Sequence, residues 1–195
     1  MTQQEILLLK QRTGWCDEIL NSISSMAEAN IYIRAGLQPR KISNRWALCR
    51  TDISWADFSI QRNTWLKTST QKRLRNYDHW AAYNNADLIG EGYPPRDPNG
   101  DPYELHHIGQ HHDSPLAELT WDEHMGQGNN PILHHTGKES EINRRHFTLE
   151  KKAYWKARFA EFTETEIQTI YPSKLCYKSE NVSNVINSLP QAASS

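Results

Sequence analysis

Seven of the nine histidines in this 195-residue chain lie between positions 106 and 135. They are His106, His107, His111, His112, His124, His134 and His135. Imidazole binds metal ions and also exchanges protons near neutral pH, so this cluster predicts metal coordination, acid–base catalysis or both. Neighbouring side chains of a strand point to opposite faces. The adjacent pair His106 and His107 could therefore carry two different functions.

Three explanations of the cluster are open on the residues alone. The first is a catalytic metal site for a phosphodiester, in which the metal neutralises developing charge and a histidine activates water. One member of the pair would bind the metal and the other would activate water. A twisted or bulged strand end would bring both functions to one phosphate. His124 and His134 could complete the coordination from the other side.

The second explanation is a closed structural zinc site made only of histidines. Such sites usually include thiolates, and none of the three cysteines of the chain lies near the cluster. The third explanation is a set of solvated surface histidines, which is the interpretation we favour for His111, His112 and His146.

The segments around the cluster predict two short strands followed by a short helix. Residues 103–108 have strand character, and residues 116–119 could form the second strand. Thr120 and Glu123 have the spacing of a capping box, which predicts a helix that begins here and carries His124. Two glycines and a proline soon after His124 should end this helix early.

Elsewhere the apolar spacing predicts mostly helix. Residues 1 to 30 are predicted to be helical with a break at Thr13–Gly14, and residues 43 to 90 are also predicted to be mainly helical. A longer helix is predicted from Ser140 to Phe162. One face of it would carry Ile142, Leu149, Ala153, Ala157 and Ala160, and a second face Trp155, Phe159 and Phe162. The fold class that follows is α+β and mainly helical.

Charge is distributed unevenly although the formal net charge is only −1. Residues 34–75 contain ten Lys or Arg against two acids, and residues 76–127 contain ten acids against Arg96 alone. Residues 138–158 are again rich in basic side chains. Acidic groups attract a metal cation and basic groups hold phosphates, so this order favours a metal-dependent protein that binds nucleic acid. Charge alone is equally consistent with a soluble protein whose surface is patchy.

Several motifs now follow one another in a specific order. They are YELHHIGQ at 103–110, DSPLAELT at 113–120, EH at 123–124 and GNNPILH at 128–134, with SEINR at 140–144 and YWKAR at 154–158 downstream. Together they resemble the HNH/endonuclease VII superfamily, and more narrowly the bacterial polymorphic-toxin nucleases named for their LHH or HHH motifs. The resemblance covers roughly residues 80 to 160, and residues 1 to 75 resemble no family.

The resemblance implies a ββα-metal finger, in which two strands and a helix hold one divalent metal ion. It implies that His106 binds the metal and that His107 is the general base that deprotonates water. His134 would be a second metal ligand, and His135 could replace it. The metal would be Zn²⁺, Ni²⁺, Mg²⁺ or Mn²⁺.

The family's central asparagine has no clear counterpart here. His124 occupies that region, with Asn129 and Asn130 nearby. His124 would therefore either bind the metal or orient His107, and it counts as both a catalytic and a metal-binding candidate. Candidates for contact with substrate phosphates are Lys138, Arg144 and Arg145.

The resemblance also divides the chain. Residues 1–79 would be an N-terminal helical region of unknown role, and residues 80–165 an HNH-type nuclease domain that includes the long C-terminal helix. Residues 166–195 would be a tail that is partly disordered, above all from Leu189 to Ser195.

The expected function is a metal-dependent endonuclease that cleaves DNA with low sequence specificity and acts as an antibacterial toxin domain. Two alternatives are a non-catalytic, metal-stabilised DNA-binding module and an RNA nuclease of the same geometry. A toxin would also require an inhibitor, or immunity protein, that protects the producing cell.

No targeting segment is evident. The apolar run at residues 6–9 is too short for the core of a signal peptide, and no span approaches membrane length. The toxin interpretation places synthesis in the bacterial cytoplasm. Transfer into a target bacterial cell would then depend on a secretion carrier or on a larger delivery protein.

Overall fold

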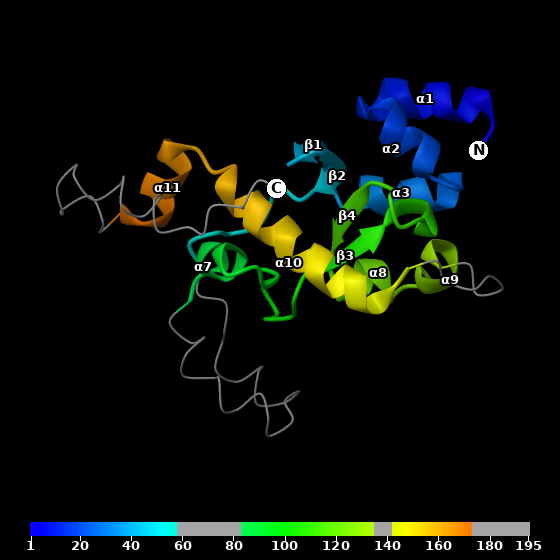
Figure 1. Ribbon diagram of the computed structural model, residues 1–195. Coiled ribbons are helices and arrows are strands. Elements are labelled where there is room, and N and C mark those ends of the chain that lie inside the picture. Colours follow the sequence, from blue (N-terminus) through cyan, green and yellow to red (C-terminus); the bar gives the residue numbers. More distant parts are fainter. Residues whose placement is uncertain (58–82, 135–141, 173–195) are drawn as a thin grey trace, which may run out of the picture. The chain divides into compact units, whose positions relative to one another are not determined.

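The computed structural model describes residues 1–57, 83–134 and 142–172 (Figure 1). The chain divides into two compact units, residues 1–161 and residues 162–195. The candidate site belongs to the first unit. In the second, the described element is helix α11 (Glu164–Ile170), which begins with a capping box at Thr163. The predictions for His135, Lys138 and the tail from Leu189 lie outside the described residues.

Three short helices open the chain, as the apolar spacing predicts. They are α1 (Gln3–Thr13), α2 (Asp17–Ser22) and α3 (Met26–Arg34). The predicted break after Thr13 is confirmed, because Gly14 ends α1 with a φ of 69°. That left-handed conformation carries no steric penalty for glycine and turns the chain toward α2.

A four-stranded mixed sheet in the order β1-β2-β4-β3 forms the centre of the first unit. Strands β1 (Gln38–Ile42) and β2 (Arg45–Cys49) pair antiparallel, as do β3 (Glu104–His107) and β4 (Leu116–Leu119), whereas β2 and β4 are parallel. Both predicted strands around the histidine pair are thus confirmed, and so is the α+β class. The prediction of helix after residue 43 is wrong for β2, which is a strand.

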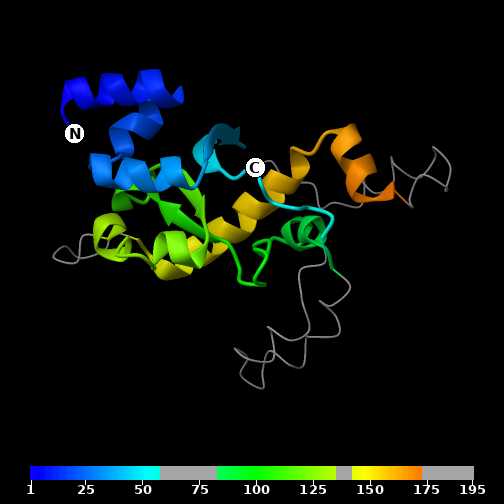
Figure 2. The ribbon, with the colours of Figure 1, turned by 180° about the vertical axis from the view of Figure 1, so that it is seen from behind.

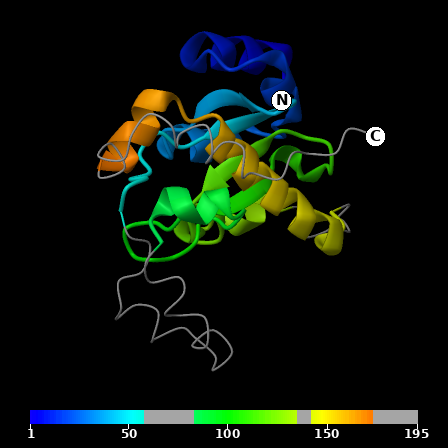
Figure 3. The same cartoon turned by 60° about the vertical axis from the view of Figure 1, so that its left-hand side comes forward.

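Each face of this sheet is covered by helices. On one face Leu48, Ala117 and Leu119 join a hydrophobic core with residues of α1–α3. On the other face lies α10 (Arg144–Ala160), whose Tyr154 hydroxyl is 3.3 Å from the Cys49 sulfur. Figure 3 shows this long helix crossing the strands, and Figure 2 shows the molecule from behind. All four residues of β4 are consequently buried.

Helix α10 confirms the predicted long helix and the predicted face with Trp155, but not the predicted stripe with Leu149. Its buried residues are Tyr154, Trp155 and Arg158, whereas Leu149 is 67% exposed. The alanines of the predicted stripe are too small to define the contact face, and the aromatic residues bury more area. The helix also begins later than predicted, because Asn143 is its N-cap and accepts hydrogen bonds from Arg145 and His146 N–H.

The chain enters β3 from a loop that one asparagine side chain holds. Helix α7 (Asn85–Gly90) is capped by Asn84, and the buried Asn85 accepts from the backbone N–H of Arg96 at 2.8 Å. The Asn85 amide also donates to the carbonyls of Ser54 and Arg96, each at 3.0 Å. Three hydrogen bonds thus fix the lead-in to the histidine pair, because buried backbone groups need partners.

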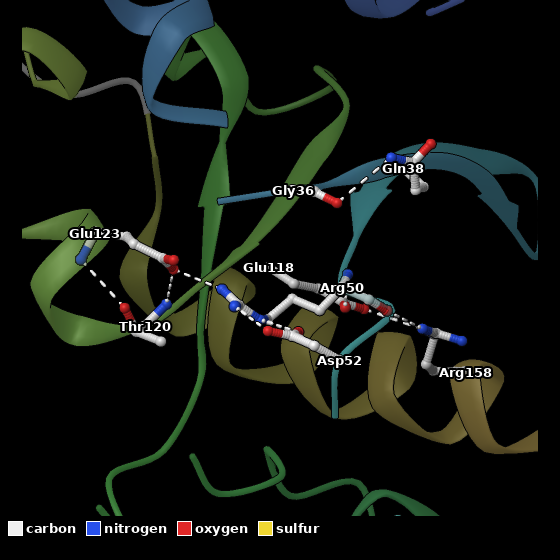
Figure 4. A network of polar contacts seen from close by, with 8 residues as sticks. All are labelled: Gly36, Gln38, Arg50, Asp52, Glu118, Thr120, Glu123 and Arg158. Carbon is white, nitrogen blue, oxygen red and sulfur yellow. Dashed lines mark hydrogen bonds and ion pairs between the residues drawn. The ribbon is translucent and has the colours of Figure 1, made fainter. Parts of the chain in front are cut away.

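A buried polar network ties α10 to the sheet (Figure 4). Glu118 of β4 is 0% exposed and accepts from Arg50 N–H at 2.7 Å, from the Tyr154 hydroxyl at 2.7 Å and from Arg158 Nε at 3.1 Å. Arg50 in turn reaches Glu123 Oε2 at 2.6 Å and also pairs with Asp52. A buried carboxylate persists when its lone pairs are satisfied and a cation is paired with it, and both conditions hold here.

Immediately after the pair, Gly109 makes a close contact with the N-terminal helices. It lies in a 3-10 turn (Ile108–Gln110) with a φ of 70°, and a Cβ built on it would be 2.2 Å from the Ser22 carbonyl oxygen. Its N–H donates to the buried Glu28 carboxylate at 3.1 Å. Glycine is required here because both the conformation and the space exclude a side chain.

The predicted boundary between residues 79 and 80 lies outside the described residues and stays a prediction. Strands β1 and β2 nevertheless come from the N-terminal side of that boundary, and β2 pairs with β4 at Ala47–Leu116 and Leu48–Ala117. Within the described residues, no helix is long and apolar enough to cross a membrane.

Candidate metal centre

Three predicted histidines come together from three different elements. His106 lies in β3, His124 ends the short helix α8 (Trp121–His124), and His134 directly follows helix α9 (Asn130–Leu133). One ring nitrogen from each of the three histidines can be chosen so that all three nitrogens lie within 4.8 Å of one another. The ring centroid of His106 lies 5.0 Å from that of His124 and 5.2 Å from that of His134.

Local sequence signals place His124 at this position. Thr120 and Glu123 form the predicted capping box at the start of α8, which orients the helix directly after β4. The buried Asn129 side chain donates to the Glu123 carbonyl at 3.0 Å and so holds the turn between α8 and α9. This turn brings His134 back toward His124, with ring centroids 4.8 Å apart.

Two of the three rings have an outer partner that fixes one nitrogen. His124 Nδ1 is hydrogen-bonded to the Glu104 carboxylate, and His134 Nδ1 lies 3.1 Å from the Asn130 carbonyl oxygen. A carboxylate or carbonyl can only accept, so the proton sits on Nδ1 in both rings and Nε2 keeps its lone pair. Metal-binding histidines usually have this second hydrogen bond, because it sets the tautomer and the ring orientation.

His106 is the most buried member of the cluster. Its Nδ1 is 3.1 Å from His124 Nε2, whereas its own Nε2 is buried and has no hydrogen-bond partner within the described residues. Burial, and the neighbouring His124, His134 and His107, hold the pKa of His106 well below its ordinary value. Burial also lowers the pKa of His134. Neutral imidazoles with free lone pairs are the form that binds a metal ion, so these residues fit a divalent cation.

His107 lies on the opposite face of β3, as strand alternation predicts. Its ring contacts Phe147 of α10, with centroids 4.4 Å apart, and its Nε2 is 3.2 Å from Glu150 Oε1. Burial, followed by the guanidinium of Arg45, lowers the pKa of His107 to about 4. The ring is therefore neutral at pH 7, which is the state that a base needs.

Residues 84–161 match a protein-family model named LHH, described as a nuclease of the HNH/ENDO VII superfamily with conserved LHH. This part of the chain is therefore similar to the LHH nucleases. The predicted resemblance to the HNH/endonuclease VII superfamily is thereby confirmed for residues 84–161, whereas the polymorphic-toxin type stays a prediction. The tripeptide occurs twice in the matched segment, at Leu105–His107 and at Leu133–His135, and each copy supplies one histidine of the cluster. Comparisons with curated proteins and with solved structures gave no match.

The other candidates within residues 84–161 are not members of the His106, His124 and His134 group. His111, His112 and His146 are exposed, and His112 Nε2 is 3.0 Å from Asp113. Arg144 and Arg145 are exposed in the first turn of α10. The assignment of a role to each of these residues stays a prediction.

Sequence reasoning missed the residues that hold His124 and His107 in place. Glu104 contacts His124, and Glu150 contacts His107, although both are ordinary surface residue types. Glu104 could have been found, because it is two positions before His106 and therefore shares its face of the strand. Glu150 carries no such signal, since it reaches His107 from a helix 43 positions later in the chain.

Proposed function

We propose that β3, β4 and α8 form a ββα-metal finger and that the chain is a metal-dependent endonuclease that hydrolyses DNA. The observation that supports this most is the convergence of His106, His124 and His134 inside the matched LHH segment. Three histidine ligands leave coordination positions open for water and substrate, as in a catalytic rather than a closed structural site.

In this proposal His106, His124 and His134 hold one divalent ion. When bound, the ion supplies positive charge that stabilises the phosphorane-like transition state and the leaving oxygen. Glu104 and Asn130 keep the second nitrogen of their histidines protonated and so hold those two rings in place. His124 is thus assigned to the metal and not to the orientation of His107.

His107 is proposed as the general base that takes a proton from the attacking water. It follows His106 directly, at the last residue of β3, and the chain turns sharply at Gly109. A base and a metal ligand that are adjacent at a strand end can serve one phosphate from its two sides. The neutral state of the His107 ring is consistent with this role.

Contact with the substrate backbone is proposed for Arg144 and Arg145. Both are exposed in the first turn of α10, where the helix dipole is unfavourable for a cation. A phosphate bound there would interact favourably with the guanidinium groups and with the helix terminus. The same contact is proposed for Lys138. Contacts of this kind carry little base specificity.

The direct test is incubation of purified, metal-loaded protein with plasmid DNA in Mg²⁺, Mn²⁺, Ni²⁺ or Zn²⁺. Nicked or linear product in at least one metal is expected, and it should disappear with chelator. Plasmid that stays intact in all four metals would exclude the proposal. A gel shift without nicks would instead support a metal-stabilised DNA-binding module, and cleavage of RNA alone would support the RNA nuclease.

The biological role that we propose is an antibacterial toxin domain. A cell that makes such a nuclease needs an inhibitor, and an acidic protein would suit the exposed basic residues of α10. Delivery into a target cell would depend on a carrier or on a larger protein. The test is growth of bacteria that express the chain with and without the product of the neighbouring gene. Equal growth of both strains, with cleavage shown in vitro, would contradict the toxin role alone.

A further inference from the structure

Glu150 stands between the proposed base and an arginine from the other end of the chain. Its Oε1 is 3.2 Å from His107 Nε2 and also forms an ion pair with Arg45. The side chains of His107, Glu150 and Arg45 are 3%, 17% and 28% exposed. The carboxylate is therefore largely shielded from water, where an ion pair and a charged hydrogen bond are stronger than at an open surface.

Arg45 is itself held by the loop before β4. Its Nε donates to the Ser114 carbonyl at 2.7 Å, and its Nη2 donates to the His112 carbonyl at 2.8 Å. With Nε and Nη2 in use, the planar guanidinium can direct its third nitrogen, Nη1, at Glu150 in only one orientation. Three elements, namely β2, the loop before β4 and helix α10, thus determine where the Glu150 oxygen lies.

The position of this oxygen bears on which nitrogen of His107 carries the proton, together with a second hydrogen bond between the ring and the His112 backbone. An ionised carboxylate can only accept, so Nε2 must be the donor in the neutral ring. Nδ1 is then the nitrogen with the lone pair. A ring in the other tautomer would hold its lone pair at Nε2, facing the Glu150 carboxylate and not water. In the serine-protease triad a wrong histidine tautomer lowers kcat by about 10⁴-fold.

We propose that Glu150, held by Arg45, is a positioning residue that keeps His107 in the Nε2–H tautomer and in one ring orientation. The proposal rests on the function proposed for His107. It also gives a role to the N-terminal part of the chain, because Arg45 lies outside the matched segment 84–161. The competing explanation is that the ion pair only fastens α10 to the sheet.

The first experiment reads the ring directly and does not depend on cleavage. Long-range ¹H–¹⁵N spectra of the full chain with ¹⁵N-labelled histidine separate protonated from unprotonated ring nitrogens, and His107→Ala assigns the signals. We expect the Nε2–H tautomer in the unsubstituted protein and a tautomer mixture in Glu150→Ala. Arg45→Lys keeps the positive charge but loses the planar set of N–H donors of the guanidinium, so it should give an intermediate mixture of tautomers.

The second experiment measures cleavage by the same proteins. In Glu150→Ala, kcat should fall on the order of 10²-fold, the lower end of what a general base contributes. KM and the affinity for the metal should change little. Glu150→Gln can still accept from Nε2–H, so it should recover much of the rate. Leu149→Ala, an exposed neighbour on the same helix, is the control for any general effect on α10.

The outcomes separate this proposal from the one on which it depends. An unchanged His107 tautomer in Glu150→Ala overturns the positioning role, and so does equal loss of activity in Glu150→Ala and Glu150→Gln with a lowered melting temperature in both. If the unsubstituted protein cleaves no nucleic acid but its His107 tautomer depends on Glu150, the nuclease proposal fails and the structural assignment stands.

Discussion

The two faces of β3 hold adjacent histidines in opposite chemical surroundings. On one face the His106 ring contacts the rings of His124 and His134, and its buried Nε2 lacks a hydrogen-bond partner within the described residues. On the other face His107 meets a carboxylate that is paired with a guanidinium. Both rings are neutral at pH 7, but the first environment offers lone pairs to a cation and the second fixes a proton. In the proposed function, strand alternation separates a metal ligand from a general base by one residue.

The comparison also shows how differently the two faces are supported. The cluster of His106, His124 and His134 is built by short elements that are close in sequence, from β3 to His134. The His107 face depends on α10 and on Arg45, which are far apart in the chain. A substitution on the first face should therefore change the affinity for the metal, whereas one on the second should change catalysis or the attachment of α10.

The largest effect is expected from the pair itself. His107→Ala should reduce cleavage by about 10²- to 10⁴-fold, the contribution of a general base, while metal binding is kept. His106→Ala should lose both cleavage and metal binding. Cleavage assays and metal titration of the two variants measure this difference, with the exposed His112→Ala as control. If His107→Ala lost the metal, the two faces of β3 would not have the separate functions of metal binding and proton transfer.

The next effect concerns the buried carboxylate on the His107 face. Glu118→Ala should lower the free energy of unfolding by about 3–5 kcal/mol, because Arg158, 2% exposed, is left without its partner. Urea unfolding of the metal-free protein measures it.

A matched comparison is available on the other side of the sheet. Glu28, 1% exposed, accepts from the neutral Tyr32 hydroxyl and Gly109 N–H, so no buried cation is left when it is removed. Glu28→Ala should therefore cost less, about 1–3 kcal/mol. A larger cost for Glu28→Ala than for Glu118→Ala would show that charge pairing does not distinguish the two carboxylates.

A smaller effect is expected from the outer partner of His124. Glu104→Gln should weaken metal binding by about 10- to 100-fold without unfolding the metal-free protein. Competition with a chelating dye gives the affinity. Asp122→Asn removes one exposed acid from the same helix as His124 and controls for general electrostatic attraction. Equal weakening in the two variants would assign the effect of Glu104 to charge rather than to contact.

The smallest effect is expected at the N-cap of α8. Thr120→Ala removes the acceptor of the Glu123 N–H and should cost about 1 kcal/mol of stability. Metal affinity should fall less than in Glu104→Gln, because His124 keeps its carboxylate partner. Thermal unfolding with and without metal tests both statements, and a fall in affinity larger than that of Glu104→Gln would contradict them.

Much of the His106 face could be predicted from the sequence because its signals are local. The strand 104–107, the strand 116–119 and the capping box at Thr120 are each encoded within a few residues. The residues alone already allow His124 and His134 to complete a metal site with His106, and the family resemblance adds the order of the motifs. The finer assignment of ligand and base stays a prediction.

The His107 face was not predictable because its partners are distant. The run from Arg45 to Cys49 is continuously apolar after its first residue, and such a run does not distinguish a buried strand from a helix. Glu118 lies in a strand whose second face is covered only because α10 returns to it. Periodicity predicts both a face with Trp155 and a stripe with Leu149, but it does not tell which one is buried, and the aromatic face is buried because its residues bury more area.

The parallel pairing of β2 with β4 has a consequence for the synthesis of the chain. Arg45 and Ser114, which the pairing brings together, are 69 positions apart. Translation therefore completes β2 well before its partner exists, and closing so long a connection is slow. Until then the hydrogen-bonding edge of β2 is open to any other extended chain. During translation the β1–β2 hairpin can therefore bind a chaperone or start aggregation before any histidine of the cluster has been made.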